Sequence, residues 1–340
     1  MPKAPSFLSH AQSFLSHAPA FWSHNGLLAR ALSPLSAIGS ALTARRIARP
    51  GWHSPVPVVC CGNVTVGGAG KTTLVIDLAH RLSARSVHIL LRGYGGTSTG
   101  THRVAPNDPA SLVGDEALLL AQAAPTWIGA DRAAGARAAV QAGARILLMD
   151  DGLQNPTLAK TLSILVIDGR TGFGNGRVLP AGPLREPIAA AAARCQAAVL
   201  IGPDTTHALA YLPPTLTVLR ADLKQDSSIA ALAGRRVVAF AGIALPEKFF
   251  APLRKAGAVV VAVRPFPDHH AYTVRELDTL LREARELGAV AVTTPKDAVR
   301  LPAAIRAQVT VIGVGLEWRE PGEIDRLLDR VIATGPSVMR

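Results

Sequence analysis

A glycine-rich run at residues 65–72 is the feature that most constrains the fold of this chain. An apolar, β-rich stretch (residues 56–61) precedes the run, and apolar residues at helical spacing (residues 72–82) follow it. Glycines let the backbone turn successive N–H groups inward at the positive end of a helix, where they bind phosphate. The pattern predicts a strand, a phosphate-binding loop and a helix. The loop consists of Thr65, Val66, Gly67, Gly68, Ala69, Gly70, Lys71 and Thr72.

The loop also predicts how a nucleotide is held. Lys71 is placed to reach the β- and γ-phosphate oxygens of ATP, and the hydroxyl of Thr72 is placed to ligate Mg²⁺. One position departs from the general pattern, because Thr65 stands where the first glycine is expected. The remaining residues and their setting between a strand and a helix still indicate nucleotide binding.

Two pairs of acidic residues are candidates for chemistry beside the loop. Asp150 and Asp151 end an apolar run (residues 146–149), as carboxylates do where a neighbouring strand supports Mg²⁺. Asp115 and Glu116 open a predicted helix, where carboxylates are also favoured by the helix dipole. The residues alone leave the second pair open between helix capping and catalysis.

Strand candidates alternate with helical stretches along the whole chain. This alternation predicts an α/β fold with a P-loop NTPase-like, doubly wound, mostly parallel sheet. At 340 residues the chain exceeds what one core usually serves, and a polar stretch (residues 224–228) separates two series of alternation. We expect a P-loop domain at residues 51–228 and a smaller α/β domain at residues 229–340.

The first 50 residues divide into two parts. Residues 1–18 contain the pentapeptide Ser-Phe-Leu-Ser-His twice and are predicted to be a poorly ordered extension. Residues 19–50 form an apolar segment that ends in Arg45, Arg46 and Arg49, and its uninterrupted apolar length is too short to span a bilayer. The pattern favours a membrane-associating helix in the lipid interface, and packing of this helix on the protein's own domain is the alternative.

The charge and composition of the chain limit the classes of binding partner that we expect. A formal charge of +12 favours an anionic partner such as nucleic acid, acidic lipid or a phosphorylated substrate. Aromatic residues make up only 4% of the chain, which argues against an ATPase that stacks nucleic-acid bases. A P-loop GTPase or metal-insertion chaperone would carry a guanine-reading Asn-Lys-x-Asp motif, and the sequence has none. We expect no nucleic acid and no obligate protein partner.

Taken together, the motifs resemble the tetraacyldisaccharide 4′-kinase family of lipid A biosynthesis. The resemblance extends from about residue 20 to residue 300, in the family's order, and that family also carries threonine at the position of Thr65. Asn155 and Pro295 depart from the family's usual residues. The matching runs are GNVTVGGAGKT (62–72), LRGYG (91–95), VGDE (113–116), DDGLQ (150–154), FGNGR (173–177), PAGPLREP (180–187), FAGI (240–243), FPDHH (266–270) and TTPKD (293–297).

The resemblance implies a reaction and a place for it. The family transfers the γ-phosphate of ATP, with Mg²⁺, to the 4′-hydroxyl of an acylated glucosamine disaccharide 1-phosphate, giving lipid IVA. It works at the cytoplasmic face of the bacterial inner membrane, on a substrate that stays in the bilayer. An interfacial helix at residues 19–50 and the positive charge of the chain suit such a substrate.

The resemblance also implies roles for the acid–base residues. Asp115 is the base that takes the proton of the hydroxyl, and His269 is its dyad partner. The sequence gives no geometry to separate His269 from the adjacent His270, which is the less favoured of the two. Because the phosphate loop lies before residue 228 and the histidine after it, we expect the site to form between two domains.

The remaining roles concern charge and substrate. Asp150 and Asp151 are expected to hold Mg²⁺ together with Thr72, directly or through water. Lys71 is expected to offset charge on the transferring phosphoryl group, with Arg177 as a further candidate. The candidate contacts with the acceptor substrate are Tyr94, Glu116, Arg177 and Arg185.

Overall fold

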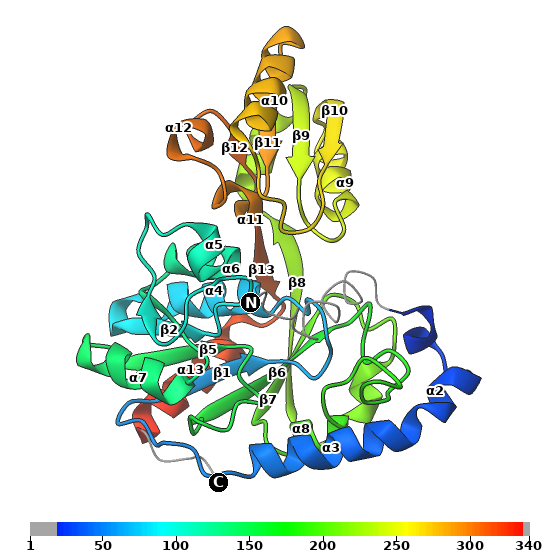
Figure 1. Cartoon of the computed structure of the whole chain (residues 1–340), viewed down its shortest axis with the longest axis vertical. Coiled ribbons are helices and arrows are strands. Elements are labelled where there is room, and N and C mark those ends of the chain that lie inside the picture. Colours follow the sequence, from blue (N-terminus) through cyan, green and yellow to red (C-terminus); the bar gives the residue numbers. More distant parts are fainter. Residues whose placement is uncertain (1–18, 336–340) are drawn as a thin grey trace, which may run out of the picture.

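The computed structural model describes residues 19–335, so the extension predicted at residues 1–18 lies outside the described residues. The chain forms a larger α/β domain and a smaller one that stands on it (Figure 1). Within residues 19–335 the larger domain contains a nine-stranded sheet, in the order β13-β8-β7-β6-β1-β5-β2-β4-β3. Its strands are β1 (Val58–Gly62), β2 (Val87–Leu91), β3 (His102–Arg103), β4 (Thr126–Ile128), β5 (Ile146–Asp150), β6 (Leu162–Asp168), β7 (Ala197–Ile201), β8 (Thr217–Gln225) and β13 (Val314–Trp318).

The larger sheet is mostly parallel, as the alternation of strands and helices predicts. The pairs from β8 through to β4 are parallel, and only the edge strands β3 and β13 pair antiparallel with their neighbours. The central strand β1 is buried along its whole length, which fits a continuous apolar run covered on both faces. Its carboxyl end leads directly into the glycine-rich loop.

Helices cover both faces of this sheet. One face is packed by α4 (Lys71–Arg81), α6 (Asp115–Ala121) and α13 (Pro321–Thr334), whose buried side chains share one core. The other face is packed by α7 (Arg132–Gln141) and α8 (Ile188–Ala192). The shorter elements of the larger domain are α5 (Ala110–Val113), η2 (Ser83–Arg85) and η3 (Ala208–Tyr211). A further short helix, η4 (Ser227–Leu232), leads into the smaller domain, where Leu232 is part of a buried cluster.

The smaller domain repeats the same principle at reduced size. Among the described residues its sheet has four parallel strands in the order β10-β9-β11-β12. Helix α9 packs on one face and α10 on the other, each with its own buried cluster. The elements are β9 (Arg236–Ala241), α9 (Glu247–Lys255), β10 (Val259–Pro265), α10 (Val274–Glu286), β11 (Val290–Thr293), α11 (Pro295–Ala298), α12 (Ala303–Arg306) and β12 (Thr310–Val311).

The end of the chain differs from the predicted domain at residues 229–340. Strand β13 returns from the smaller domain and pairs antiparallel with β8, so two adjacent strands connect the domains (Figure 1). Helix α13 then packs on the larger core, where Ile324 and Val331 are fully buried. The smaller domain therefore ends before residue 314. The sequence does not indicate this arrangement, because the apolar face of α13 does not reveal which sheet it covers.

The N-terminal segment lies along the larger domain, at the end opposite the smaller one (Figure 1). It comprises η1 (Ala20–Ser23), α2 (Leu27–Ala31) and α3 (Ser33–Ile47). Ser36 is buried and donates from Oγ to the carbonyl oxygen of Val178 at 2.7 Å, which fixes one face of α3 on the domain. Among residues 19–335, no helix has both the length and the apolar character needed to cross a membrane.

Candidate active site

The glycine-rich loop joins β1 to the first turn of α4. Gly70, which precedes the helix, has a φ of +80°, and a Cβ at this position would lie 2.7 Å from Cδ1 of Ile201. Both observations require glycine here. Asn63 is buried at the start of the loop and donates from its side chain to Oγ1 of Thr65 at 2.9 Å. Thr65, which departs from the general pattern, is therefore fixed within the loop by its hydrogen bond from Asn63.

Lys71 contacts two side chains beside the loop. Its ammonium donates to the side-chain oxygen of Asn63 at 2.9 Å and lies 3.6 Å from the carboxylate of Asp151. Arg185 donates from Nη1 to both oxygens of Asp151, at 2.9 and 2.8 Å. Burial raises the pKa of Asp151, but the charges of Lys71 and Arg185 outweigh it and hold this pKa below its ordinary value. Asp151 is thus an ionised partner of two cations.

Asp150 has a different environment, although it is adjacent in sequence. The residue is 3% exposed, and the Thr72 hydroxyl donates to its Oδ2 at 3.3 Å, while the buried Oδ1 has no hydrogen-bond partner among the described residues. Burial, followed by the charges of Glu116 and Asp151, raises the pKa of Asp150 to about 7. A buried carboxylate with a free oxygen beside a threonine hydroxyl suits a hard cation such as Mg²⁺. Thr72 and Asp150 therefore fit the predicted metal site, and Asp151 stands beside it.

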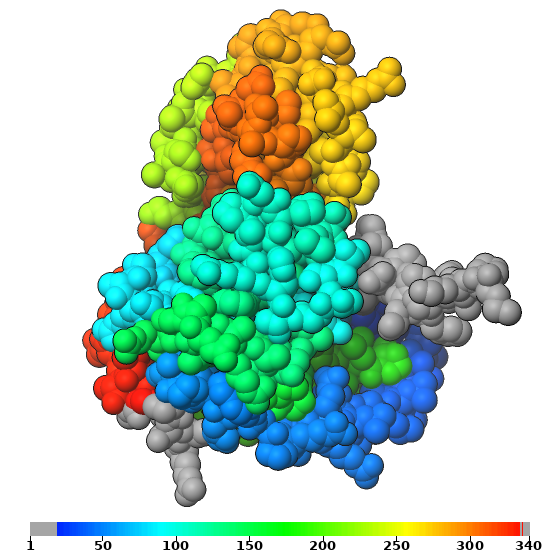
Figure 2. All heavy atoms as spheres, turned by 60° about the vertical axis from the view of Figure 1, so that its left-hand side comes forward, coloured from blue at the N-terminus to red at the C-terminus, as the bar shows by residue number. Residues whose placement is uncertain are grey.

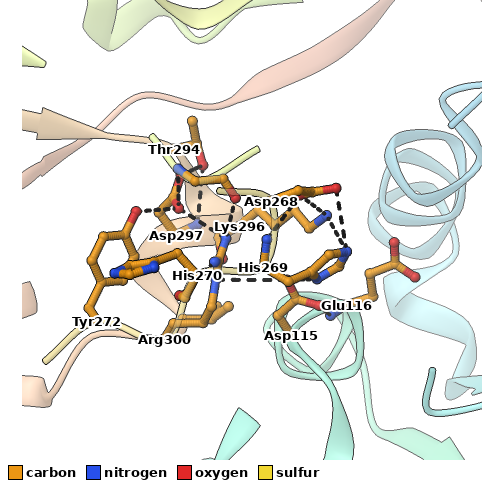
Figure 3. A network of polar contacts seen from close by, with 12 residues as sticks. Asp115, Glu116, Asp268, His269, His270, Tyr272, Thr294, Lys296, Asp297 and Arg300 are labelled. Atoms are coloured by element: carbon orange, nitrogen blue, oxygen red, sulfur yellow. Dashed lines mark hydrogen bonds and ion pairs between the residues drawn. The ribbon is translucent and has the colours of Figure 1, made fainter. Parts of the chain in front are cut away.

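Asp115 and His269 meet across the two domains (Figure 3). Asp115 begins α6 of the larger domain, and Nδ1 of His269, from the loop after β10, lies 2.9 Å from its Oδ2. The N–H of Glu116 donates to the other oxygen of Asp115, at 2.9 Å. Asp115 is 5% exposed, whereas the side chain of His269 is 43% exposed. The pair combines a buried carboxylate with an accessible imidazole.

The turn before Asp115 is also tightly constrained. Gly114 has a φ of +87°, and a Cβ there would lie 2.4 Å from the carbonyl oxygen of Tyr94. Only glycine allows this approach, so the loop that carries Tyr94 and the start of α6 are fixed against each other. His269 likewise has a positive φ, +58°, which is strained for a residue with a Cβ.

The electrostatics of the pair favour a charged state. Burial raises the pKa of Asp115, but the hydrogen bond from His269 and the positive charge of Lys296 lower it further than burial raises it. The hydrogen bond to Asp115 raises the pKa of His269 above its ordinary value, against the opposing effect of burial. His270 has other partners: its Nε2 lies 3.2 Å from Glu276 and its ring stacks on Phe266.

The other predicted site residues divide between the site and its surroundings. The charge of Glu116 contributes to the raised pKa of Asp150, so this carboxylate lies within electrostatic range of Asp150. Tyr94 is 57% exposed, in the loop beside Gly114. Arg177 contacts the N-terminal segment instead, donating from Nε to Asn25 at 2.7 Å and from Nη1 to Ser33 at 2.5 Å. In this structure its guanidinium is therefore committed to that segment.

Three residues of the site were not singled out by sequence reasoning. Asn63 holds the loop lysine, and Lys296 and Arg300 face the acid–base pair. Asn63 lies in the GNVTV run and Lys296 in the TTPKD run, so membership of these motifs was the available signal. Arg300 follows the second motif by three residues and carries no such signal.

Comparison with known proteins places the chain in a family. The model of the tetraacyldisaccharide-1-P 4′-kinase family matches residues 28–333, which is most of the chain. The chain belongs to this family. Tetraacyldisaccharide 4′-kinases from Gluconacetobacter diazotrophicus and Gluconobacter oxydans are 58% and 54% identical to it, over 89% of this chain and 94% of each relative. The 4′-kinase family resemblance deduced from the motifs is confirmed.

A solved structure of this 4′-kinase family has the same fold. The crystal structure of the "apo" form of LpxK from Aquifex aeolicus in complex with ATP superposes with a TM-score of 0.72 at 26% identity, covering 90% of this chain and 100% of that one. The chain is thus a phosphotransferase of the family, and the predicted α/β fold with a large, mostly parallel sheet is confirmed.

Proposed function

We propose that this 4′-kinase transfers the γ-phosphate of ATP to the 4′-hydroxyl of tetraacyldisaccharide 1-phosphate, in the formation of lipid A. The observation that carries the proposal is the 2.9 Å contact between Asp115 and His269 across the two domains, next to Glu116, whose charge reaches Asp150 beside the phosphate loop. Asp115 contacts the imidazole of the smaller domain, and Glu116 acts on the carboxylate beside the loop. The geometry serves attack by a hydroxyl on a bound phosphate.

Lys71 is the residue that offsets charge on the transferring group. To reach phosphate oxygens its ammonium leaves Asn63 and Asp151, which hold it beside the loop in the structure. Arg185 keeps its two hydrogen bonds to Asp151. The negative charge of Asp151 therefore still has a cationic partner when Lys71 moves away. A positive group placed where negative charge develops lowers the barrier to phosphoryl transfer.

The acid–base pair receives the proton of the sugar hydroxyl. A hydroxyl is a weak nucleophile, and a base aligned with it assists the attack. We assign this role to Asp115, with His269 as the partner that orients the carboxylate and shares the proton. The exposed imidazole marks the side from which an acceptor approaches, because the carboxylate itself is buried.

Mg²⁺ is a proposed component of the site. Thr72 and Asp150 would hold it, since the buried carboxylate, beside the threonine hydroxyl, has an oxygen with no hydrogen-bond partner within residues 19–335. When bound, the cation would neutralise charge on the β- and γ-phosphate oxygens. In Asp150→Asn, binding of an ATP analogue should lose its dependence on Mg²⁺, as measured by calorimetry with and without EDTA. Unchanged Mg²⁺ dependence would remove Asp150 from this role.

We also propose that the kinase acts as a peripheral protein at the cytoplasmic face of the inner membrane. Leu35, Ile38 and Leu42 lie on one face of α3 and are 55%, 60% and 60% exposed. Arg45 and Arg46 are exposed at the end of the same helix, where they can meet anionic headgroups. An acceptor that stays in the bilayer requires an enzyme that reaches the lipid surface.

Incubation of the purified chain with γ-labelled ATP, Mg²⁺ and detergent-dispersed tetraacyldisaccharide 1-phosphate tests the reaction. Labelled lipid is expected, and it should disappear in Asp115→Asn while ATP binding persists. A lipid product with the label elsewhere than on the 4′-oxygen would refute the assigned position. No labelled lipid at all would refute the proposed acceptor.

A further inference from the structure

Two cations of the smaller domain face the acid–base pair from one short segment (Figure 3). Lys296 lies in α11, and Arg300 follows one turn later. Figure 2 shows the segment that carries α5 and α6 in direct contact with the smaller domain, so Arg300 meets Asp115 at the interface between the two domains. The two residues have different partners and make different contributions.

Lys296 contacts the ring nitrogen of His269 that does not face Asp115. Its Nζ lies 3.3 Å from Nε2 of His269 and 3.4 Å from Oδ1 of Asp268. An ammonium group can only donate, so Nε2 is the acceptor in this contact whenever the imidazole is neutral. The ring proton is then on Nδ1, where it is donated to the carboxylate of Asp115. The position of Lys296 thus favours the Nδ1–H tautomer when the imidazole is neutral.

Arg300 holds the other member of the pair from within the interface. Its side chain is 5% exposed, and its Nε lies 3.8 Å from Oδ2 of Asp115. The same guanidinium donates to the carbonyl oxygens of His270 and Gly242, at 2.9 and 3.0 Å, and to Asp297 at 2.9 Å. Arg300 therefore ties the loop that carries the histidine to the carboxylate on the opposite domain.

Asp297 makes Arg300 rigid. It is fully buried and accepts hydrogen bonds from the hydroxyl of Tyr272 at 2.7 Å and from the N–H of Gly242 at 2.8 Å. Thr294 donates to its second oxygen at 2.6 Å. A buried carboxylate whose oxygens are all engaged fixes its cationic partner in one orientation. The position of Arg300 is thus set by the fold of the smaller domain.

We propose that Lys296 and Arg300 are positioning residues of the kinase: Lys296 fixes the tautomer of His269, and Arg300 holds the ionised carboxylate of Asp115 against it. The inference rests on the proposed function, because it concerns the same acid–base pair. It goes beyond the proposed function because it makes the activity of the Asp115–His269 pair depend on two further residues, Lys296 and Arg300. It also explains why the strained backbone of His269 is maintained, since the ring must reach both neighbours.

The charged groups around Asp115 and His269 determine in which direction the pH dependence of kcat shifts when Lys296 is replaced. His269 is faced by Asp115, Asp268 and Lys296, while Asp115 is faced by His269, Lys296 and Arg300. The charge of Lys296 lowers the pKa of both members of the pair. Loss of this charge raises both values, so the acid limb of the kcat profile moves to higher pH.

Kinetics of Lys296→Gln provide the first test. We expect kcat at neutral pH to fall on the order of tenfold or more, with KM for ATP unchanged and the acid limb displaced to higher pH. Lys296→Arg should recover part of the loss, because the charge is retained. Lys255→Gln is the matched control: it removes one lysine charge from an exposed position at the end of α9 and should leave the profile unchanged.

A spectroscopic measurement separates the inference from the function itself. In the full-length protein with ¹⁵N-labelled histidine, the signals absent from His269→Asn belong to the dyad ring. The wild-type ring should report the neutral Nδ1–H tautomer at high pH, and Lys296→Gln should shift it toward Nε2–H and raise its titration midpoint. This readout needs no activity, so it remains informative if the acceptor substrate proves to be a different one.

The outcomes that overturn the inference are distinct from those that overturn the function. A Lys296→Gln enzyme with an unchanged pH profile and an unchanged ring titration refutes the positioning role while the dyad stands. A large rise in KM for ATP without a change in the ring signals would instead make Lys296 a phosphate-binding residue and refute the role as well. Arg300→Lys, which keeps the charge but not the fork of hydrogen bonds, tests the second residue. This test requires that the circular dichroism spectrum and melting temperature of Arg300→Lys match those of the wild type. If they do not, Tyr272→Phe is used in its place, because it removes only one hydrogen bond to Asp297, the partner of Arg300.

Discussion

The ammonium of Lys71 lies 3.6 Å from the carboxylate of Asp151, so the lysine of the phosphate loop is paired with an acidic residue of the same site. Lys71→Met removes the positive group that the phosphates require, and Asp151 keeps Arg185 as its partner. We expect kcat/KM to fall on the order of 100-fold or more, with little change in the melting temperature. Steady-state kinetics and thermal unfolding check the two halves of this prediction. A loss of activity explained by unfolding would contradict it.

The contact between Asp115 and His269 should stabilise the protein only within a range of pH. The lowered pKa of Asp115 contributes stability above its ordinary value of 3.8, and the raised pKa of His269 contributes stability below 6.5. His269→Asn keeps a residue that tolerates the positive φ but loses the titrating ring. It should cost about 1 kcal/mol near pH 5.5, a modest value because the ring is half-exposed, and less at pH 9. A difference in melting temperature that does not vary with pH would exclude this linkage.

Two glycines of the phosphate loop, Gly68 and Gly70, should differ in how much they contribute to the stability of the fold. In Gly70→Ala the left-handed backbone alone costs about 1–2 kcal/mol, and the contact with Ile201 adds to this. Gly68 has no neighbour within 4 Å of an added Cβ and no positive φ, so Gly68→Ala should leave the melting temperature almost unchanged. Its effect should be seen only on ATP binding, where the methyl group enters the space for phosphate. Equal destabilisation by both variants would count against this distinction.

The exposed apolar face of α3 should determine binding to lipid. Replacing Leu35, Ile38 and Leu42 by serine removes three side chains from the proposed interface and should release the protein from vesicles that contain anionic lipid. Kinase activity toward a short-chain, detergent-soluble acceptor should persist. Leu245→Ser with Val274→Ser is the control, because these residues are 57% and 61% exposed in the smaller domain. Equal loss of flotation by the control would argue against a localised membrane face.

The phosphate loop and its surroundings could be predicted because their signals are local. Glycines between a strand and a helix determine the turn by themselves, and Asp150 follows directly from the apolar run that becomes β5. The dyad required the family resemblance. Asp115 and His269 are far apart in sequence, and no periodicity predicts which loop of one domain meets which helix of another.

The structure assigns partners that the sequence could not. Asp150 and Asp151 are adjacent and chemically identical, yet one lies beside Thr72 with a free oxygen and the other neutralises two cations. Arg177 was a candidate at the phosphates, but its guanidinium binds Asn25 and Ser33. Such choices depend on long-range packing, as does the return of β13 to the larger sheet. The membrane role of the N-terminal segment stays a prediction.

One stretch of backbone, residues 178–185, touches both the N-terminal helix and the phosphate loop. Val178 accepts from Ser36 of α3, while Pro183 accepts from the N–H of Val66 at 2.9 Å and Arg185 donates to the carbonyl oxygen of Val64 at 2.6 Å. If α3 tilts on a lipid surface, the movement acts on residues 178–185, which are hydrogen-bonded to the phosphate loop. Bilayer composition is therefore a variable to hold constant in any measurement of ATP turnover, even one in which the lipid is thought of only as a solvent for the acceptor.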